Sequence, residues 1–325
     1  MAEHTIDVAG TRAGYDEASP VLLRCTAPDA LSNLVAVLEL AADRQLRYGT
    51  ASRRPTAATV KLVEDVLVAG DYYEGGEPVA AVAWPALLQI GGLAQQAGTT
   101  VELTRRGESI LAEPSYQALS ALWGRWLTCV SHDELARVEA IKGQSKPSTL
   151  TSVPQRRAAV AAALASVDPG TWVESDDLLA TLRMQRAPLV VARSLLARYR
   201  LYLIDSYYGS LGNLGHRAWS LVEGRYALCV LFEYAATMGM IDVAYTDPAG
   251  ARGDYRDIWG GNQLAWLSRY DGLVAVRVNE LGTAILHDPS AVPRLGLPEP
   301  RPSALAPVQR VQPQAALWRR QVWEP

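Results

Sequence analysis

The chain has 325 residues, of which 49% are hydrophobic and 20% are charged, and this balance predicts folded domains and excludes a disordered chain. Its formal net charge of -3 at pH 7 excludes a protein that coats nucleic acid through overall charge, so any contact with DNA must be local. Cys25, Cys129 and Cys229 lie about a hundred residues apart, which excludes a disulfide framework and a CxxC metal site.

The sequence indicates a cytoplasmic protein that makes no contact with a membrane. No apolar run approaches the roughly twenty residues that a membrane-spanning helix needs, because Glu233 interrupts the most apolar stretch, residues 227–245. The first residues are acidic and lack the basic and apolar regions of a signal peptide.

The first half of the chain reads as a helical module. An N-terminal arm, residues 1–27, precedes this module, which we place at residues 28–150. Apolar residues at helical spacing predict one helix that starts at Pro28 and a second that starts at Pro55. A third, apolar helix is expected over residues 85–97, ended by the glycine that follows.

The second half repeats this order in a module that we place at residues 151–289. After two helices, a further apolar helix is expected over residues 188–202. A long apolar helix is then predicted over residues 222–238 and a strand over residues 241–245. Residues 290–325 are rich in proline, which favours an extended tail.

A fourteen-residue pattern occurs in both modules and carries the fold prediction. The two copies cover residues 101–114 and 276–289. Each copy has a strand, then Thr104 or Asn279 as a helix N-cap, and Gly107 or Gly282 three positions later. Because an apolar helix ending in glycine precedes each copy, the order matches the back half of a winged helix. We therefore predict a mostly α-helical protein with small β-hairpins, built from tandem winged helix-turn-helix domains.

No residue pattern predicts catalysis, a metal site or a cofactor. The GxxxxGK[ST] phosphate loop is absent, and no histidine stands in an HExxH arrangement. The adjacent Asp176 and Asp177 lie at a predicted helix start, where carboxylates interact favourably with the positive end of the helix dipole. We expect a protein that is not an enzyme and holds no cofactor.

Basic side chains outside the predicted third helices are the candidates for DNA contact. A winged helix usually presents its third helix to the major groove and its wing to phosphates, but both predicted third helices carry few basic residues. We expect one basic stripe, with Arg105 and Arg106 on the first wing; the alternative is that the arginines only keep the protein soluble. The candidate nucleic-acid-binding residues are Arg44, Arg47, Arg53, Arg54, Arg105, Arg106, Lys142, Lys146, Arg156, Arg157 and Arg225.

Tryptophans divide into candidates for partner binding and candidates for the core. An insert of about twenty-five residues follows the strand at 241–245, and its aromatic side chains and those of the tail indicate a protein interface. The candidate partner-binding residues are Trp259, Trp266, Trp318 and Trp323. The tryptophans expected in the core are Trp84, Trp123, Trp126, Trp172 and Trp219.

Several short stretches carry a resemblance to a known family. They are residues 53–59, 70–73, 83–85, 103–107, 122–126 and 141–144. Across about residues 31–289 the chain resembles the winged-helix modules attached to XPB-like superfamily-two helicases of actinomycetes. The resemblance implies a helicase-accessory or DNA-associated module, and the lack of any helicase motif makes its function depend on partners.

These observations give two expectations of function. The first is a protein that binds DNA weakly through its arginines while docking to a larger DNA-processing assembly. Its partner would be a helicase, a nuclease or another ATPase, including in a phage-defence setting. The second is a protein–protein adaptor or scaffold that makes no direct contact with DNA.

Overall fold

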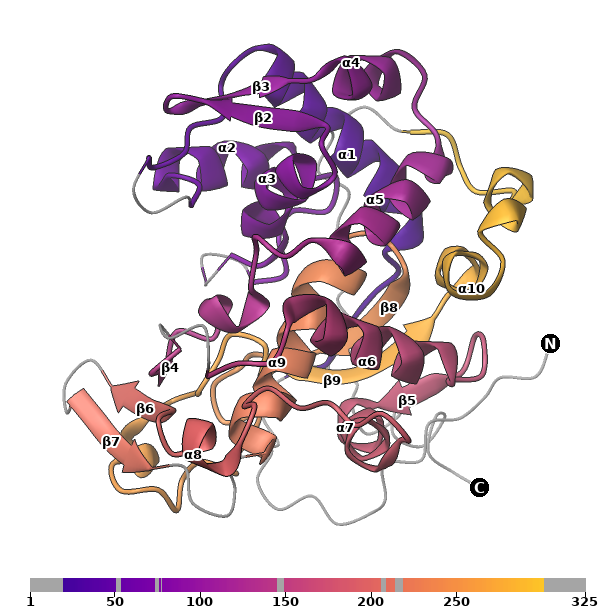
Figure 1. Ribbon diagram of the computed structural model, residues 1–325. Coiled ribbons are helices and arrows are strands. Elements are labelled where there is room, and N and C mark those ends of the chain that lie inside the picture. The colour runs from indigo at the N-terminus through magenta and orange to yellow at the C-terminus, as the bar shows by residue number, and fades with distance from the viewer. Residues whose placement is uncertain are drawn as a thin grey trace.

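Helices and small antiparallel sheets make up the fold in a computed structural model (Figure 1). It describes residues 20–50, 54–73, 76, 78–144, 149–205, 209–213 and 219–300. The expected mixture of helices and small hairpins is present, and the β-structure is more extensive than the sequence predicted.

The first half begins with three helices and a hairpin. They are α1 (Ala27–Ala42), α2 (Ala57–Val66), α3 (Ala80–Ile90), β2 (Ala94–Ala97) and β3 (Thr100–Leu103). Pro28 lies in the first turn of α1, and the Thr56 side chain caps α2 by accepting a hydrogen bond from the Thr59 N–H. A β-bridge between Arg47 and Thr100 places the chain before α2 beside β3.

The third helix is shifted from its predicted position. It was expected over residues 85–97, but it starts at Ala80, contains Pro85 and ends at Ile90. Gly92 adopts a left-handed conformation with φ of +65°, and the Leu93 N–H closes the helix end on the Leu88 carbonyl. The residues that follow therefore extend into β2 instead of continuing the helix.

A buried carboxylate fixes the start of α3. Asp71 accepts hydrogen bonds from the backbone N–H groups of Tyr72, Val79, Ala80 and Ala81. These donors include the first N–H groups of the helix, which have no partner within the helix itself. The Asp71 side chain thus caps the N-terminus of α3.

Two further helices follow in the first half. They are α4 (Arg105–Ala112) and α5 (Tyr116–Thr128). Trp123 and Trp126 lie on α5 and are both buried.

The second half contains a long buried helix between shorter elements. The elements η1 (Glu134–Arg137) and β4 (Ile141–Lys142) still belong to the first half. Those that precede the long helix in the second half are α6 (Val153–Ala165), β5 (Trp172–Glu174), α7 (Ser175–Met184), α8 (Leu195–Arg198), β6 (Tyr202–Asp205) and β7 (Gly209–Asn213). The long helix, residues 219–235, consists of η3 (Trp219–Gly224), α9 (Arg225–Cys229) and η4 (Val230–Ala235). After it come β8 (Ile241–Tyr245), η5 (Gly261–Gln263), β9 (Leu273–Val278), α10 (Glu280–His287) and η6 (Pro289–Arg294).

The apolar helix expected over residues 188–202 is largely absent. Only the four residues of α8 are helical, and the chain before them is extended, with a β-bridge between Leu150 and Ala192. Tyr202 starts β6, which pairs with β4 and β7 in a three-stranded antiparallel sheet that the sequence did not predict.

The N-terminal segment joins the sheet of the second half. The order of this sheet is β1-β8-β9-β5, with all neighbours antiparallel, and β1 is Leu22–Arg24. Thr26 anchors the segment, because its N–H donates to Asp242 and its hydroxyl donates to the Ile241 carbonyl. Residues 20–27, expected as part of a free arm, are therefore structured, whereas residues 1–19 lie outside the described part.

The two copies of the fourteen-residue pattern have the same helix start. The Thr104 hydroxyl accepts from the Gly107 N–H at 3.2 Å, and the Asn279 amide oxygen accepts from the Gly282 N–H at 3.0 Å. Both predicted N-caps are confirmed.

The glycine in each copy lies against an equivalent backbone carbonyl. A Cβ atom on Gly107 would lie 2.1 Å from the Leu93 oxygen, and one on Gly282 would lie 1.9 Å from the Met240 oxygen. Each of these carbonyls comes directly after a left-handed glycine that follows a helix. The sequence repeat is thus a structural repeat at these positions.

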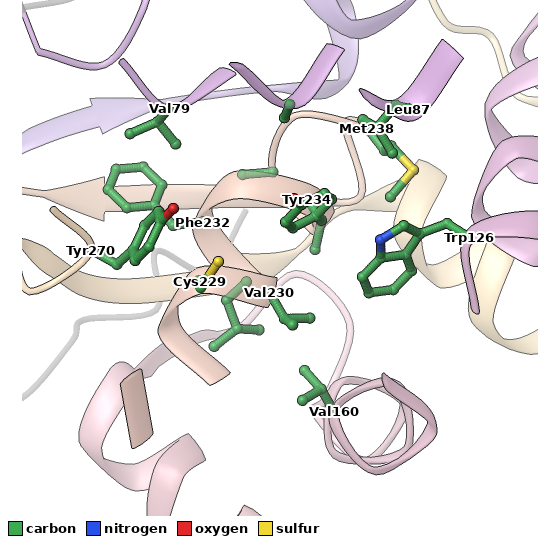
Figure 2. Packing of buried hydrophobic residues seen from close by; sticks show 14 of the residues in the cluster. Val79, Leu87, Trp126, Val160, Cys229, Val230, Phe232, Tyr234, Met238 and Tyr270 are labelled. Carbon is green, nitrogen blue, oxygen red and sulfur yellow. The ribbon is translucent and has the colours of Figure 1, made fainter. Parts of the chain in front are cut away.

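The hydrophobic core is continuous across the domain boundary predicted near residue 150. Figure 2 shows Leu87 and Trp126 of the first half packed with Tyr234 and Met238 of the second. The Trp126 and Tyr234 rings stack with their centroids 5.5 Å apart. Every residue from 221 to 246 is buried, so the long helix and β8 lie at the centre of this core.

Candidate functional site

Two of the arginines predicted to contact DNA are buried in ion pairs. Arg156 and Arg157 lie on α6 and are 1% and 0% exposed. Arg156 binds both carboxylate oxygens of Asp133, at 2.9 and 2.7 Å, and Arg157 donates from Nε to Glu134 at 2.8 Å. Because both guanidinium groups face inward, the prediction that they bind nucleic acid is wrong.

Glu134 is the centre of this buried network. Its carboxylate accepts from the Trp126 indole N–H at 3.0 Å and from the Tyr226 hydroxyl at 3.2 Å, in addition to Arg157. Arg157 also donates to the backbone carbonyls of Cys129 and His132. The network ties α5, η1, α6 and the long helix together, and its charges are satisfied internally.

A second buried pair links η1 to the long helix. The Arg137 Nε donates to Glu233 at 2.8 Å, and the Tyr270 hydroxyl donates to the same carboxylate. Burial alone lowers the pKa of Arg137, but the charge and hydrogen bond of Glu233, together with Tyr270 and Tyr234, outweigh burial and hold that pKa well above its ordinary value.

The third DNA-binding candidate that fails is Arg225, at the centre of the long helix. It is 1% exposed and binds Asp271 at 2.9 Å and Asp254 at 2.6 Å. Burial alone raises the pKa of Asp254, but the charge and hydrogen bonds of Arg225, helped by Ser220 and Arg252, lower it to about 2. The arginine therefore holds the insert, residues 246–272, onto the long helix and does not face a ligand.

Both helices that a winged helix would present to DNA are covered by protein. The long helix is buried from Leu221 to its end, and α3 is buried over most of its length, with Gln89 and Ile90 only partly exposed. Helix-in-groove recognition requires side chains that reach base edges. Neither helix can enter a major groove in this conformation.

The remaining basic candidates are on the surface where they are described. Arg105 and Arg106 lie in the first turn of α4, not at the tip of the β2–β3 hairpin where a wing would place them. Figure 1 shows α4 and β4, which carries Lys142, far apart, so these cations do not form one continuous stripe.

Some surface cations also have acidic neighbours. Arg44 lies 3.5 Å from Glu102, and Arg54 lies 3.6 Å from Glu139. Arg47 is exposed and donates to the Thr100 hydroxyl. Two further candidates, Arg53 and Lys146, lie outside the described residues.

The tryptophans divide largely as predicted. Trp84, Trp123 and Trp126 are buried, which confirms their place in the core, whereas Trp172 and Trp219 are only partly buried. The candidate partner-binding residues of the insert are exposed, Trp259 by 71% and Trp266 by 39%. The other two candidates, Trp318 and Trp323, lie outside the described residues.

A basic and apolar surface around α8 was missed by the sequence prediction. Leu195, Leu196 and Tyr199 are all more than half exposed there. The signal in the sequence was the absence of any acidic residue between Asp177 and Asp205, a stretch that contains five arginines.

A cavity of about 370 Å³ lies between α5, α6 and α10. Small and apolar side chains line it, including Gly124, Ala161 and Ile285, and Ser120 is the polar one. This lining offers a surface for packing and no acid–base pair for catalysis.

Comparison of the chain with protein-family models, curated proteins and solved structures gave no significant match. Within the described ranges, no group of His, Cys, Asp or Glu is arranged to hold a metal ion. None of the helices that the structure describes is long and apolar enough to cross a bilayer.

Proposed function

We propose that this chain is a non-catalytic tandem winged-helix protein that acts as an adaptor within a cytoplasmic DNA-processing assembly. The observation that carries the proposal is the burial of α3 and the long helix, which removes the usual DNA-reading surfaces of both winged helices. A winged helix without a free third helix offers its outer surface to proteins.

The order of elements supports the tandem winged-helix interpretation. In the first half α1, the bridge at Arg47, α2, α3, β2 and β3 follow one another. In the second half α6, β5, α7, the long helix, β8 and β9 come in the same order, with α8, β6 and β7 inserted between α7 and the long helix. In the first half β3 lies between β2 and the bridge residue Arg47, which precedes α2. In the second half β9 lies in the same way between β8 and β5, which precedes α7.

The charge distribution supports an adaptor over a DNA-binding protein. Three candidate cations are neutralised in the core by carboxylates, and the surface cations are spread over separate elements. Phosphate binding depends on several cations acting together, because each contact releases a counterion. With a net charge of -3, the chain supplies no general attraction for DNA.

Fluorescence anisotropy with a labelled DNA duplex at low and moderate salt tests the proposal. We expect no binding tighter than the weak, non-specific range of about 10⁻⁴ to 10⁻⁶ M, and no effect of Arg105→Ala plus Arg106→Ala. The matched control is Arg186→Ala plus Arg256→Ala, two exposed arginines outside the predicted stripe. Tight, salt-steep binding that only the first pair weakens would contradict the adaptor function.

Mass measurement of the tagged full-length chain, purified from its own host, supplies the positive test. An adaptor is expected to elute in a larger complex that contains a helicase, nuclease or other ATPase in a fixed ratio. Elution as the chain alone, in extracts prepared at low salt and in the absence of DNA, would count against the proposal.

A further inference from the structure

The segment around α8 has some apolar side chains that are buried and others that are exposed. Ala197 and Leu201 are buried, whereas Leu195, Leu196 and Tyr199 are 68%, 67% and 60% exposed. Single exposed apolar side chains are normal on a protein surface, but a contiguous group marks an interaction site. We define the α8 face as Leu195, Leu196, Tyr199, Tyr202, Lys142 and Arg200.

Strand pairing adds a cation to this face. β4 and β6 pair Ile141 with Leu203 and Lys142 with Tyr202. The first pair is buried, so the second pair points to the opposite, outer side of the sheet. Lys142 is exposed beside Tyr202, which links the aliphatic part of the face to a positive charge.

The surroundings of the α8 face are basic on a chain that is acidic overall. No acidic residue occurs between Asp177 and Asp205. Glu223 neutralises Arg198, at 3.1 Å, but Arg200 is exposed and forms no ion pair with any residue that the structure describes. The face therefore combines open apolar surface with uncompensated positive charge.

Backbone contacts hold the face in place. The Val191 N–H donates to Glu223 at 3.1 Å, and the Arg193 N–H donates to the Thr149 carbonyl at 3.0 Å. A Cβ atom on Gly143 would lie 1.9 Å from the Arg200 backbone oxygen, so the backbone segments at Gly143 and Arg200 are in direct contact. A face that is already ordered loses little conformational entropy when a partner binds.

We propose that the α8 face docks an acidic segment of a partner protein that also carries apolar side chains, an inference that rests on the adaptor function above. The cations attract carboxylates and set the orientation, while the leucines and tyrosines bury apolar groups. Single-stranded DNA fits less well, because stacking on bases requires aromatic rings and the two most exposed apolar side chains here, Leu195 and Leu196, are aliphatic.

Short peptides displayed on phage and selected on the immobilised full-length chain provide the probe. We expect the selected peptides to combine Asp or Glu with large apolar residues. Their dissociation constants, measured by anisotropy, should rise at least about tenfold in Leu196→Ala plus Tyr199→Ala and in Lys142→Glu plus Arg200→Glu.

Matched controls separate the face from general surface effects. Met184 is 82% exposed but outside the face, and Arg105 is an exposed cation on α4. Met184→Ala and Arg105→Glu should each leave the peptide affinity within about twofold. Thermal unfolding followed by circular dichroism establishes that each variant is folded.

Two results would overturn the inference and leave the adaptor function standing. One is selection of peptides without acidic residues, or of peptides whose affinity neither pair of face variants changes. The other is tighter binding of labelled single-stranded DNA than of any peptide, lost in the same variants. Duplex binding that depends on Arg105 and Arg106 instead contradicts the adaptor function, whatever the peptides do.

Discussion

Replacing Asp254 by asparagine tests how the insert is held on the long helix. The substitution keeps the shape of the side chain but removes the charge that pairs with Arg225, while Asp271 stays 2.9 Å from the same arginine. Burial raises the pKa of Asp254, but Arg225, with smaller contributions from Ser220 and Arg252, lowers it overall from 3.8 to about 2. That fall in pKa means that the folded state stabilises the charged carboxylate by about 2 kcal/mol at neutral pH. We expect Asp254→Asn to lower the unfolding free energy by this amount.

The pH dependence gives this prediction its sharpest test. Because the pKa of Asp254 is lower in the folded than in the unfolded state, its stabilisation is complete above about pH 4 and is lost as the pH falls towards 2. In urea denaturation, the difference between the wild type and Asp254→Asn should therefore shrink over that range. The control is Asp168→Asn, an exposed carboxyl expected to change stability by less than about 0.5 kcal/mol. A difference that stays constant with pH, or that is no larger than the control, refutes the reasoning.

Two other substitutions probe the core and the repeat. Arg157→Leu leaves the buried Glu134 carboxylate without its cation, so urea denaturation should show a loss of about 3–5 kcal/mol in unfolding free energy. A loss under about 1 kcal/mol would mean that Glu134 does not depend on this cation in the folded state. Gly282→Ala forces a Cβ against the Met240 carbonyl and should lower the melting temperature, whereas Gly124→Ala, with no atom within 4 Å of the added Cβ, should leave it unchanged or raise it. Equal melting temperatures for the two alanine variants would show that the backbone contact is easily relieved.

Local signals in the sequence predicted local structure well. The N-caps Thr104 and Asn279 and the glycines three positions later were predicted from spacing alone, because a cap depends on residues within one helical turn. The end of α3 was misplaced for a related reason. Gly92 and Gly98 both adopt the left-handed conformation that can end a helix, and only the pairing of β2 with β3 decides which of them does so.

The burial of the arginines could not be predicted, because their partners are distant in the sequence. Glu134 is 23 residues from Arg157, Asp271 is 46 from Arg225, and Glu233 is 96 from Arg137. An arginine on a predicted helix looks the same whether it faces solvent or a buried acid. Their predicted positions, beside the linker or at the start of a helix, therefore favoured DNA contact for side chains that stabilise the core.

The α8 face, in contrast, has a signal in the sequence that the prediction did not use. The stretch without acidic residues was visible in the sequence, but the periodicity favoured one continuous apolar helix over residues 188–202. The structure breaks that stretch into extended chain, α8 and β6, which turns some of its apolar residues outward. Hydrophobic spacing predicted burial, whereas the pairing of β4 with β6 turns Leu203 inward and Tyr202 outward.

The pairing of β1 with β8 has a consequence for synthesis on the ribosome. Leu22 leaves the exit tunnel long before Tyr245, its partner in the register, has been made. While only the first half has been synthesised, β1 has no strand to pair with. A fragment that begins after β1 would expose the edge of β8 to neighbouring molecules. Separate production of the C-terminal half should therefore give aggregates unless residues 20–26 are supplied with it.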